Sequence, residues 1–270
     1  MSRQRLGWVH YGLEMTYVEI LGHPTWMSIG MENDETVLLL HGGIVDSRSL
    51  LDSIGPALSE HYCVAAFDRR GHGRTADTAE ALHYDAMADE TIGVLEHLDR
   101  PTHLVGHSDG GDVGLLVAMR RPDLVQRLIM IGSNFHHAGL LPIGELTPDD
   151  PSGVYEMFAT MYGECSPDGR EHFDEFLAKT YAMWASEPEL TPADLATVTV
   201  PVLVLVADDD AIKLAHTCLL YESIPGAQLA VVPGASHLLP IEQPEETVRI
   251  IRKFLQASDP PATMMPIRRA

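Results

Sequence analysis

Short apolar runs recur along the chain, and segments with helical spacing separate most of them. A continuous apolar run is typical of a parallel strand that is covered on both faces. The runs lie at residues 36–40, 62–67, 104–106, 128–131, 202–206 and 228–232. Helical patterns lie at residues 49–59, 84–98, 112–119 and 242–255. This alternation predicts a mostly parallel, doubly wound α/β sheet.

Two further segments near the start, residues 15–20 and 25–29, predict another pair of strands. Gly22-His23-Pro24 joins them, and these turn residues favour a hairpin at the edge of the sheet. Together with the apolar runs, the hairpin brings the expected sheet to about eight strands. Gly55-Pro56 is expected to break or kink the first helical segment.

The alternation stops between residues 134 and 198. Helical patterns at 154–161 and 172–184 replace it, and so long a stretch is not an ordinary connection between strands. We therefore expect a helical cap at 134–198, inserted into an α/β core formed by residues 1–133 and 199–257. Residues 258–270 are expected to form a dispensable, disordered tail.

Composition narrows the possible partners and compartments. The chain has 270 residues, 45 % of them hydrophobic and 21 % charged, which suits one large globular α/β domain. A net charge of −21 disfavours nucleic acid and anionic membranes as partners. Three widely spaced cysteines without a Cys-x-x-Cys pattern indicate neither a disulfide framework nor a zinc site. With no signal-peptide pattern and no run of about 18 apolar residues, we expect a cytoplasmic protein.

The run at 104–106 ends in Gly106-His107-Ser108-Asp109-Gly110, and a helical pattern follows at once. A serine on a tight strand-to-helix turn projects its hydroxyl above the sheet, where free N–H groups at the helix start can face it. A bare Gly-x-Ser-x-Gly string is equally compatible with a turn that is capped by a serine, so the context has to decide.

The context is a Ser, acid, His order along the chain. Three aspartates, Asp208, Asp209 and Asp210, follow the run at 202–206, and His237 follows the last run. Carboxyl ends of parallel strands meet at one edge of a sheet, so these groups are expected to converge there. A serine hydroxyl needs such a base, and the base needs a third group to orient it.

These motifs, together with His41-Gly42-Gly43 and the 68–74 segment with its Arg-Gly-His-Gly core, resemble the α/β-hydrolase superfamily. The resemblance is to small bacterial esterases, C–C hydrolases and cofactor-free perhydrolases with a helical cap, and it covers most of the core. It implies Ser108 as nucleophile, His237 as general base and Asp210 as orienting acid. Ala207 stands where the family pattern has glycine, which leaves Asp209 as an alternative acid.

The resemblance also implies an oxyanion hole made by the backbone N–H groups of Asp109 and Gly43, with Ile44 as the alternative to Gly43. The carboxylate of Asp109 has two interpretations. It caps or pairs locally at the start of the helix, where a negative charge is favoured, or it faces the pocket and attracts a cationic group. The strand-to-helix turn at residues 106–110 is called the elbow below. Similar elbows with the sequence Ser-Asp-Gly-Gly occur in enzymes that resemble valacyclovir hydrolase.

Residues at the opening of the cap and along its helical patterns are candidates for substrate binding. Aromatic and methionine side chains recur there at roughly helical intervals, and most are expected to form the core of the cap while some close an apolar pocket. Our candidates are Ile44, Asn134, Phe135, His136, Met157, Met161, Trp184 and Leu238. The adjacent His136 and His137 do not have metal-ligand spacing, because neighbours on a helix face apart.

The sequence therefore predicts a serine hydrolase that cleaves an ester or lactone of a small to medium, partly hydrophobic molecule through an acyl-enzyme. Neither a cofactor nor a metal is expected. C–C bond hydrolysis, peracid formation and cyanohydrin cleavage remain alternatives on the same three residues. A ligand-binding receptor that keeps the fold is the alternative without catalysis.

Overall fold

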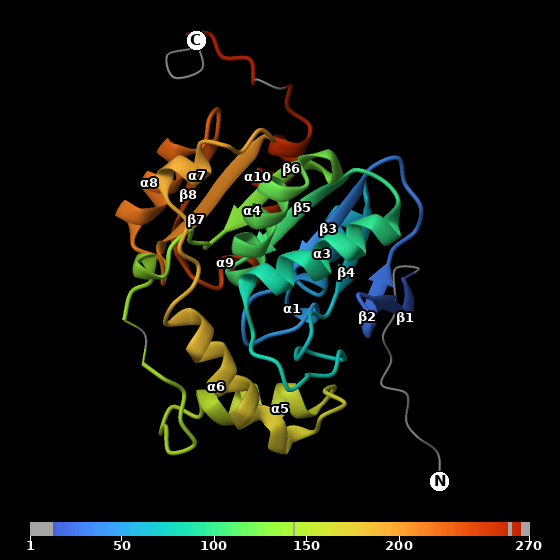
Figure 1. Ribbon diagram of the computed structural model, residues 1–270. Coiled ribbons are helices and arrows are strands. Elements are labelled where there is room, and N and C mark those ends of the chain that lie inside the picture. The colour runs from blue at the N-terminus through green and yellow to red at the C-terminus, as the bar shows by residue number, and fades with distance from the viewer. Residues whose placement is uncertain (1–12, 143, 259–260, 266–270) are drawn as a thin grey trace.

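The computed structural model describes residues 13–142, 144–258 and 261–265. Eight strands within these residues form one sheet in the order β1-β2-β4-β3-β5-β6-β7-β8. The pairs β1–β2 and β2–β4 are antiparallel, and every other neighbouring pair is parallel. The predicted sheet, with a hairpin at one edge, is confirmed (Figure 1).

Each predicted strand is present, with ends that differ by a few residues. The strands are β1 Glu14–Ile20, β2 His23–Ile29, β3 Thr36–Leu40, β4 Cys63–Phe67, β5 Thr102–His107, β6 Val125–Ile131, β7 Val202–Asp209 and β8 Gln228–Ser236. The last two strands extend beyond their apolar runs, because Asp209 pairs with Ser236 after a shift in register. This extension carries the chain to Asp210 and His237.

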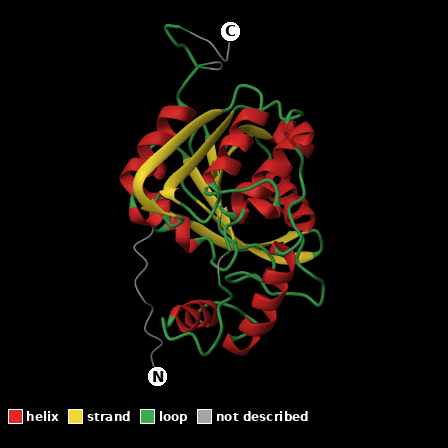
Figure 2. Cartoon of the chain, turned by 90° about the vertical axis from the view of Figure 1, so that its left-hand side faces the viewer, coloured by secondary structure: helices red, strands yellow, loops and turns green. Residues whose placement is uncertain are grey.

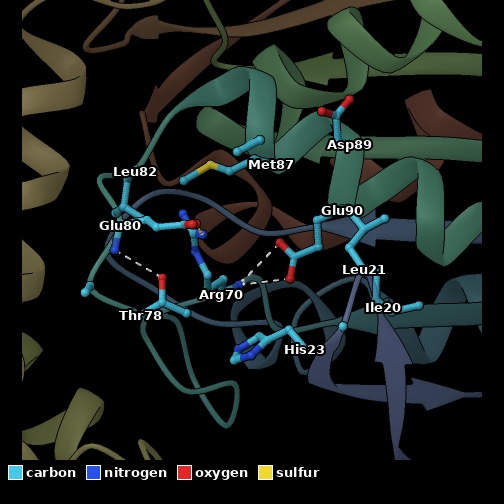
Figure 3. Close-up of a pocket in the computed structure, with 13 residues that line it drawn as sticks. Ile20, Leu21, His23, Arg70, Thr78, Glu80, Leu82, Met87, Asp89 and Glu90 are labelled. Carbon is cyan, nitrogen blue, oxygen red and sulfur yellow. Dashed lines mark hydrogen bonds and ion pairs between the residues drawn. The ribbon is translucent and has the colours of Figure 1, made fainter.

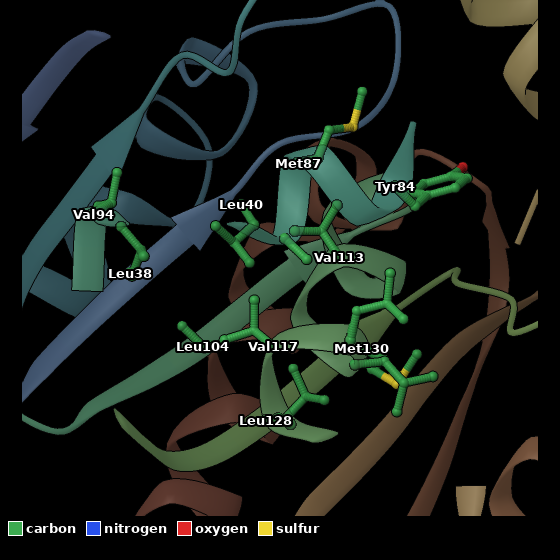
Figure 4. Close-up of a cluster of buried hydrophobic side chains, with 14 of the residues drawn as sticks. Leu38, Leu40, Tyr84, Met87, Val94, Leu104, Val113, Val117, Leu128 and Met130 are labelled. Atoms are coloured by element: carbon green, nitrogen blue, oxygen red, sulfur yellow. The ribbon is translucent and has the colours of Figure 1, made fainter. Parts of the chain in front are cut away.

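Helices cover both faces of the sheet, as Figure 2 shows. Side chains alternate along a strand, so Leu38 and Leu40 join the core on one face while Val37 and Leu39 join the core on the other. The first core, part of which is drawn in Figure 4, includes side chains of α3 (Tyr84–Leu98), α4 (Asp109–Arg120) and α8 (Leu214–Ser223). Helices α1 (Arg48–Leu51), α2 (Gly55–Ser59), α9 (Leu239–Glu242) and α10 (Pro244–Leu255) pack on the second.

The predicted helix at 49–59 is two short helices, α1 and α2. Pro56 lies in the first turn of α2, where its missing N–H costs no hydrogen bond. The break therefore falls just before Gly55-Pro56, as the sequence suggests.

The long segment between β6 and β7 carries α5 (Val154–Gly163) and α6 (Phe173–Trp184), which we call the cap helices. They lie together beyond one end of the sheet (Figure 1). Helix α7 (Pro192–Leu195) lies beside α8 instead, and Leu141 donates its N–H to the carbonyl of Ala211 in the core. Both ends of the segment thus pack on the core.

No helix among the described residues is long and apolar enough to cross a membrane. The predicted tail at 258–270 falls largely outside the described residues.

Candidate active site

The turn between β5 and α4 places Ser108 in a strained backbone conformation, with φ 53° and ψ −125°. Two positions before it and two positions after it, only glycine fits. A Cβ on Gly106 would lie 2.2 Å from the carbonyl oxygen of Gly110, and one on Gly110 would lie 2.1 Å from that of Leu40. The Ser108 N–H donates to the carbonyl of Ile131 at 2.8 Å, which holds the turn against β6. Strain of this kind is found at functional sites.

Ser108, His237 and Asp210 come together at the carboxyl ends of three strands. His237 Nε2 lies 3.1 Å from Ser108 Oγ, and His237 Nδ1 lies 2.8 Å from Asp210 Oδ1. The structure thus brings Asp210, and not Asp209, to the histidine. Asp209 is exposed, and Asp208 accepts the Gly234 N–H at 2.8 Å.

The environment of Asp210 keeps it a carboxylate. Burial raises its pKa. The hydrogen bond from His237 and the Coulombic interaction with that histidine lower the pKa by more than burial raises it, so the pKa lies below its ordinary value. A carboxylate in this position holds Nδ1 protonated and leaves Nε2 free to accept the serine proton.

His107, the variable residue of the elbow, supports the loop that carries His237. Its Nε2 donates to the carbonyl oxygen of His237 at 2.7 Å. Burial lowers the pKa of His107 to about 4, so the ring is neutral near pH 7 and Nε2 carries its proton. The contact is with the backbone of His237, which fits a packing role better than a second base.

The predicted oxyanion donors, the N–H groups of Gly43 and Asp109, belong to residues that line one cavity with Ser108. Neither N–H donates to an acceptor within the described part of the chain. A Cβ on Gly43 would lie 2.3 Å from the Trp184 ring and 2.5 Å from Asp109 Oδ2. Residue 43 is therefore packed directly beneath the end of a cap helix.

The carboxylate of Asp109 is buried and fully engaged. It accepts hydrogen bonds from Tyr84 Oη at 2.9 Å and from Trp184 Nε1, which lies 3.0 Å from both carboxylate oxygens. Burial raises the pKa of Asp109, and the nearby Arg69 charge and these two donors counter part of that rise. Neither interpretation of Asp109 describes these contacts, because both donors are uncharged and lie on other helices, α3 and α6: the carboxylate joins helix α6 to the elbow.

The cavity above Ser108 has a volume of about 280 Å³ and mostly apolar walls. Four of the eight predicted binding residues line it: Ile44, Asn134, Trp184 and Leu238. Further walls come from residues that we did not single out or named only within the cap as a whole: Val45, Tyr84, Leu140, Gly144, Leu146, Phe158, Tyr181 and Ala211.

The other four predicted binding residues lie outside this lining. Phe135 is buried and stacks on His216, with ring centroids 4.1 Å apart. Met157 is 50 % exposed, because successive helix positions are about 100° apart and its neighbour Phe158 takes the inward direction. Met161 lines an outer groove beside Arg48.

His136, the fourth, stacks on the ring of His137 at 4.4 Å, so the expectation that these neighbours face apart is wrong. The pair is not helical: His136 is extended and His137 begins a 3₁₀ turn. Ligand atoms of both histidines and Glu189 lie within 4.8 Å of one another. His136 Nδ1 accepts the Ala138 N–H, and His137 Nε2 lies 3.9 Å from Glu189, so these groups already have protein partners.

A separate groove of about 550 Å³ lies between the β1–β2 turn and α3, and Ser108 does not line it (Figure 3). Glu90 lies in its wall and accepts the backbone N–H of Arg70 at 3.1 Å, while the Arg70 guanidinium pairs with Glu80. Burial raises the pKa of Glu90 to about 7. None of the predicted site residues lines this groove, but Glu90 in its wall holds the 68–74 loop through the Arg70 N–H.

Comparison with known proteins agrees with the fold and the motifs. The family model described as "Alpha/beta hydrolase family" matches residues 37–250, so the chain belongs to that family. A Haemophilus influenzae protein with the provisional name esterase/lipase is 24 % identical over 83 % of this chain and 84 % of its own. A Caulobacter protein with the provisional name carbamate hydrolase RutD is 26 % identical over 88 % of this chain and 95 % of its own.

Among solved structures, a serine hydrolase of Cycloclasticus zankles is similar with a TM-score of 0.77 and 22 % identity. The match covers 90 % of this chain and 98 % of that one. At this level of identity the likeness concerns the fold. This chain is a hydrolase of the α/β class.

Proposed function

We propose that this hydrolase cleaves carboxylic esters or lactones through an acyl-enzyme formed on Ser108. The observation that carries the proposal is the pair of contacts of His237, 3.1 Å to Ser108 Oγ and 2.8 Å to Asp210 Oδ1. These distances lie within the reach that a general base needs to activate a nucleophile.

The steps follow from these positions. His237 Nε2 takes the hydroxyl proton as Ser108 Oγ attacks the substrate carbonyl, and the electron pair of the carbonyl moves onto its oxygen. The N–H groups of Gly43 and Asp109 hold that oxyanion. The C–O bond to the alcohol breaks, and the protonated His237 gives the leaving oxygen its proton. His237 then takes a proton from a water molecule, which attacks the acyl carbon. The bond to Ser108 Oγ breaks and His237 returns the proton to Oγ, which releases the acid and the free serine.

The cavity supports a small, neutral and largely apolar acyl group. None of its described lining residues is arginine or lysine, so an anionic substrate finds no fixed positive side chain there. Both oxygens of Asp109 already have protein donors, so a cationic substrate gains little from that carboxylate. The names of the two relatives, an esterase/lipase and a carbamate hydrolase, both refer to attack at a carbonyl carbon that bears oxygen.

The test is hydrolysis of p-nitrophenyl acetate and butyrate by the wild type and by Ser108→Ala. We expect turnover in the wild type, and in the variant a loss of at least about 10⁴-fold, as when a nucleophile is removed elsewhere. Ser223→Ala at the end of α8, where the hydroxyl donates to the Leu219 carbonyl of its own helix, is the matched control. Ligand binding without turnover, or unchanged turnover in Ser108→Ala, would contradict the proposal.

A further inference from the structure

Arg69 is among the largest fully buried side chains of the described residues, with no exposed surface. Burying a charge is expensive unless it is paired, yet no carboxylate forms an ion pair with Arg69 in the part of the chain that the structure describes. Its guanidinium instead donates to two backbone carbonyls, from Nη1 to His41 O at 2.7 Å and from Nη2 to Gly42 O at 2.9 Å. Both carbonyls belong to the loop that carries the predicted oxyanion donor.

These contacts determine where the Gly43 N–H points. In a trans peptide the carbonyl of one residue and the N–H of the next point in opposite directions. The Gly42 carbonyl is drawn toward the buried guanidinium, so the Gly43 N–H is turned away from it, toward the cavity that Gly43 and Ser108 line. A charged donor also polarises the peptide, which strengthens the N–H as a donor.

A second donor holds the same carbonyl. His41 Nε2 accepts the backbone N–H of Arg69 at 3.2 Å, so the neutral ring carries its proton on Nδ1, which lies 2.7 Å from Gly42 O. Burial and the Arg69 charge lower the pKa of His41, so this neutral form prevails near pH 7. The backbone and the side chain of Arg69 thus both act on the peptide between residues 42 and 43.

The loop that supplies Arg69 is itself anchored. Asp68 accepts hydrogen bonds from the Ser47 hydroxyl at 2.5 Å and from the Arg74 guanidinium at 2.8 Å, and the next residue, Arg70, is held by Glu90. Residues 41–43, which we call the oxyanion loop, have a further contact: His72 Nε2 lies 2.5 Å from Gly43 O. Hydrogen bonds within the protein therefore hold both this loop and the neighbouring one.

We propose that Arg69 is a positioning residue that orients and polarises the Gly42–Gly43 peptide for the oxyanion hole. This inference rests on the proposed function, since an oxyanion forms only if Ser108 attacks a carbonyl. The guanidinium acts through the peptide and does not touch the substrate. Its effect is expected in the transition state and much less in substrate binding.

The experiment compares Arg69→Met and Arg69→Lys with Arg70→Met, whose guanidinium contacts Glu80 and the Ala81 carbonyl and not the oxyanion loop. We measure kcat and KM for p-nitrophenyl butyrate, the inhibition constant of phenylboronic acid, and the melting temperature. Phenylboronic acid forms a tetrahedral adduct with an active serine, whose oxygen occupies the oxyanion hole. Its affinity therefore reports on the hole without turnover.

We expect Arg69→Met to lower kcat by about 10²-fold, the size of effect seen when one oxyanion donor is lost. KM should change little, and boronate affinity should fall by a factor similar to that in kcat. Arg69→Lys keeps the charge but cannot reach both carbonyls in the same way, so its values should lie between those of Arg69→Met and the wild type. Arg70→Met should match the wild type in kcat and boronate affinity.

Wild-type kcat and boronate affinity in a folded Arg69→Met or Arg69→Lys would overturn the inference. If Arg69→Met does not fold, Arg69→Lys decides. If neither folds, Arg69 serves stability alone and the positioning role is rejected. Failure of the proposed function shows differently: the wild type turns over no ester. If it still binds phenylboronic acid, the affinities of the variants test the orientation of the Gly43 N–H; if it binds none, Ser108 is not an active nucleophile and both proposals are rejected.

Discussion

The α/β core and the cap helices contribute to the site in different ways. The core supplies every group of the proposed chemistry, each at the end of a strand and each fixed by hydrogen bonds, such as those of His237 with Ser108 and Asp210. The cap helices supply mainly apolar surface, from Phe158, Tyr181 and Trp184. The core thus holds the groups of the proposed reaction, while the cap helices add apolar walls to the cavity above Ser108.

One polar contact joins the two regions at the reaction centre. The indole N–H of Trp184 donates to Asp109, the residue after the nucleophile, and the same ring lies against Gly43. A shift of α6 would therefore move a wall of the cavity and press on the oxyanion loop at once. Because these two effects act together, substitutions at the contact should affect both binding and rate.

The largest effect is expected when the core loses its general base, His237. We expect His237→Ala to lower kcat by about 10⁴-fold or more, because the serine then has no proton acceptor. The melting temperature should also fall, because the buried Asp210 carboxylate loses its hydrogen bond from His237. Steady-state kinetics with p-nitrophenyl butyrate measure the loss, and His61→Ala, on the surface, is the control. A loss of less than about tenfold would contradict the role of His237.

A methyl group at the boundary between core and cap should have the next largest effect. Gly43→Ala places a Cβ 2.3 Å from the Trp184 ring, so either α6 or the oxyanion loop must move. We expect kcat/KM to fall by about 10²-fold, as for loss of an oxyanion donor. Gly144→Ala, also in the cavity lining but with no atom within 4 Å of the added Cβ, should retain nearly full activity. Equal activity of the two variants would show that the boundary is not tightly packed.

Sequence pattern predicts the core far better than the cap, for a physical reason. Continuous apolar runs such as Thr36–Leu40 locate buried strands, and the order of strands places Ser108, Asp210 and His237 at one edge of the sheet. In the cap, hydrophobic spacing marks the helices but not which side faces the core. That direction decides between Met157 and Phe158, and it depends on how the helix docks.

Arg69 shows a second limit of sequence reasoning. The 68–74 segment stands out in the sequence through its Arg-Gly-His-Gly core, but the pattern does not show that Arg69 points inward, onto the carbonyls of residues 41 and 42. Tyr84, a donor to Asp109, was missed for the same reason. A charged residue directly after an apolar strand was the available signal for Arg69. That signal does not tell which way the Arg69 side chain points, because its direction depends on where the loop of residues 41–43 lies.

On the cap side, Trp184→Phe keeps an aromatic ring and removes the N–H that bonds to Asp109. We expect the free energy of unfolding to fall by about 1–3 kcal/mol, the cost of a lost donor to a buried acceptor. KM should rise more than kcat falls, because the ring shapes the cavity. Tyr181→Phe, on the same helix, loses a hydrogen bond to the Leu146 N–H and not to Asp109. If both variants behave alike, the Trp184–Asp109 contact has no special role.

The last expected effect concerns the pH dependence of stability and comes from a residue of the core, Glu90. Burial raises the pKa of Glu90 from 4.5 to about 7, so the folded state binds an extra proton between these values. Stability associated with this group is therefore highest at low pH, is lost as the pH rises from about 4.5 to about 7, and is constant above that. Glu90→Gln should reduce the loss of unfolding free energy between pH 5 and pH 8 by about 2 kcal/mol.

Urea unfolding at the two pH values measures this difference. Asp89→Asn, on the exposed neighbour in α3, should keep the wild-type slope. Parallel pH profiles for Glu90→Gln and the wild type would show that Glu90 titrates in the folded protein as it does in the unfolded chain.

The most direct test of the central claim, that Ser108 is a nucleophile activated by His237, is covalent labelling by a fluorophosphonate. Peptide mapping by mass spectrometry locates the adduct. We predict one adduct on Ser108 in the wild type, none in Ser108→Ala, and labelling of His237→Ala that is slower by orders of magnitude. An adduct on another residue, or labelling of His237→Ala at the wild-type rate, would contradict the claim.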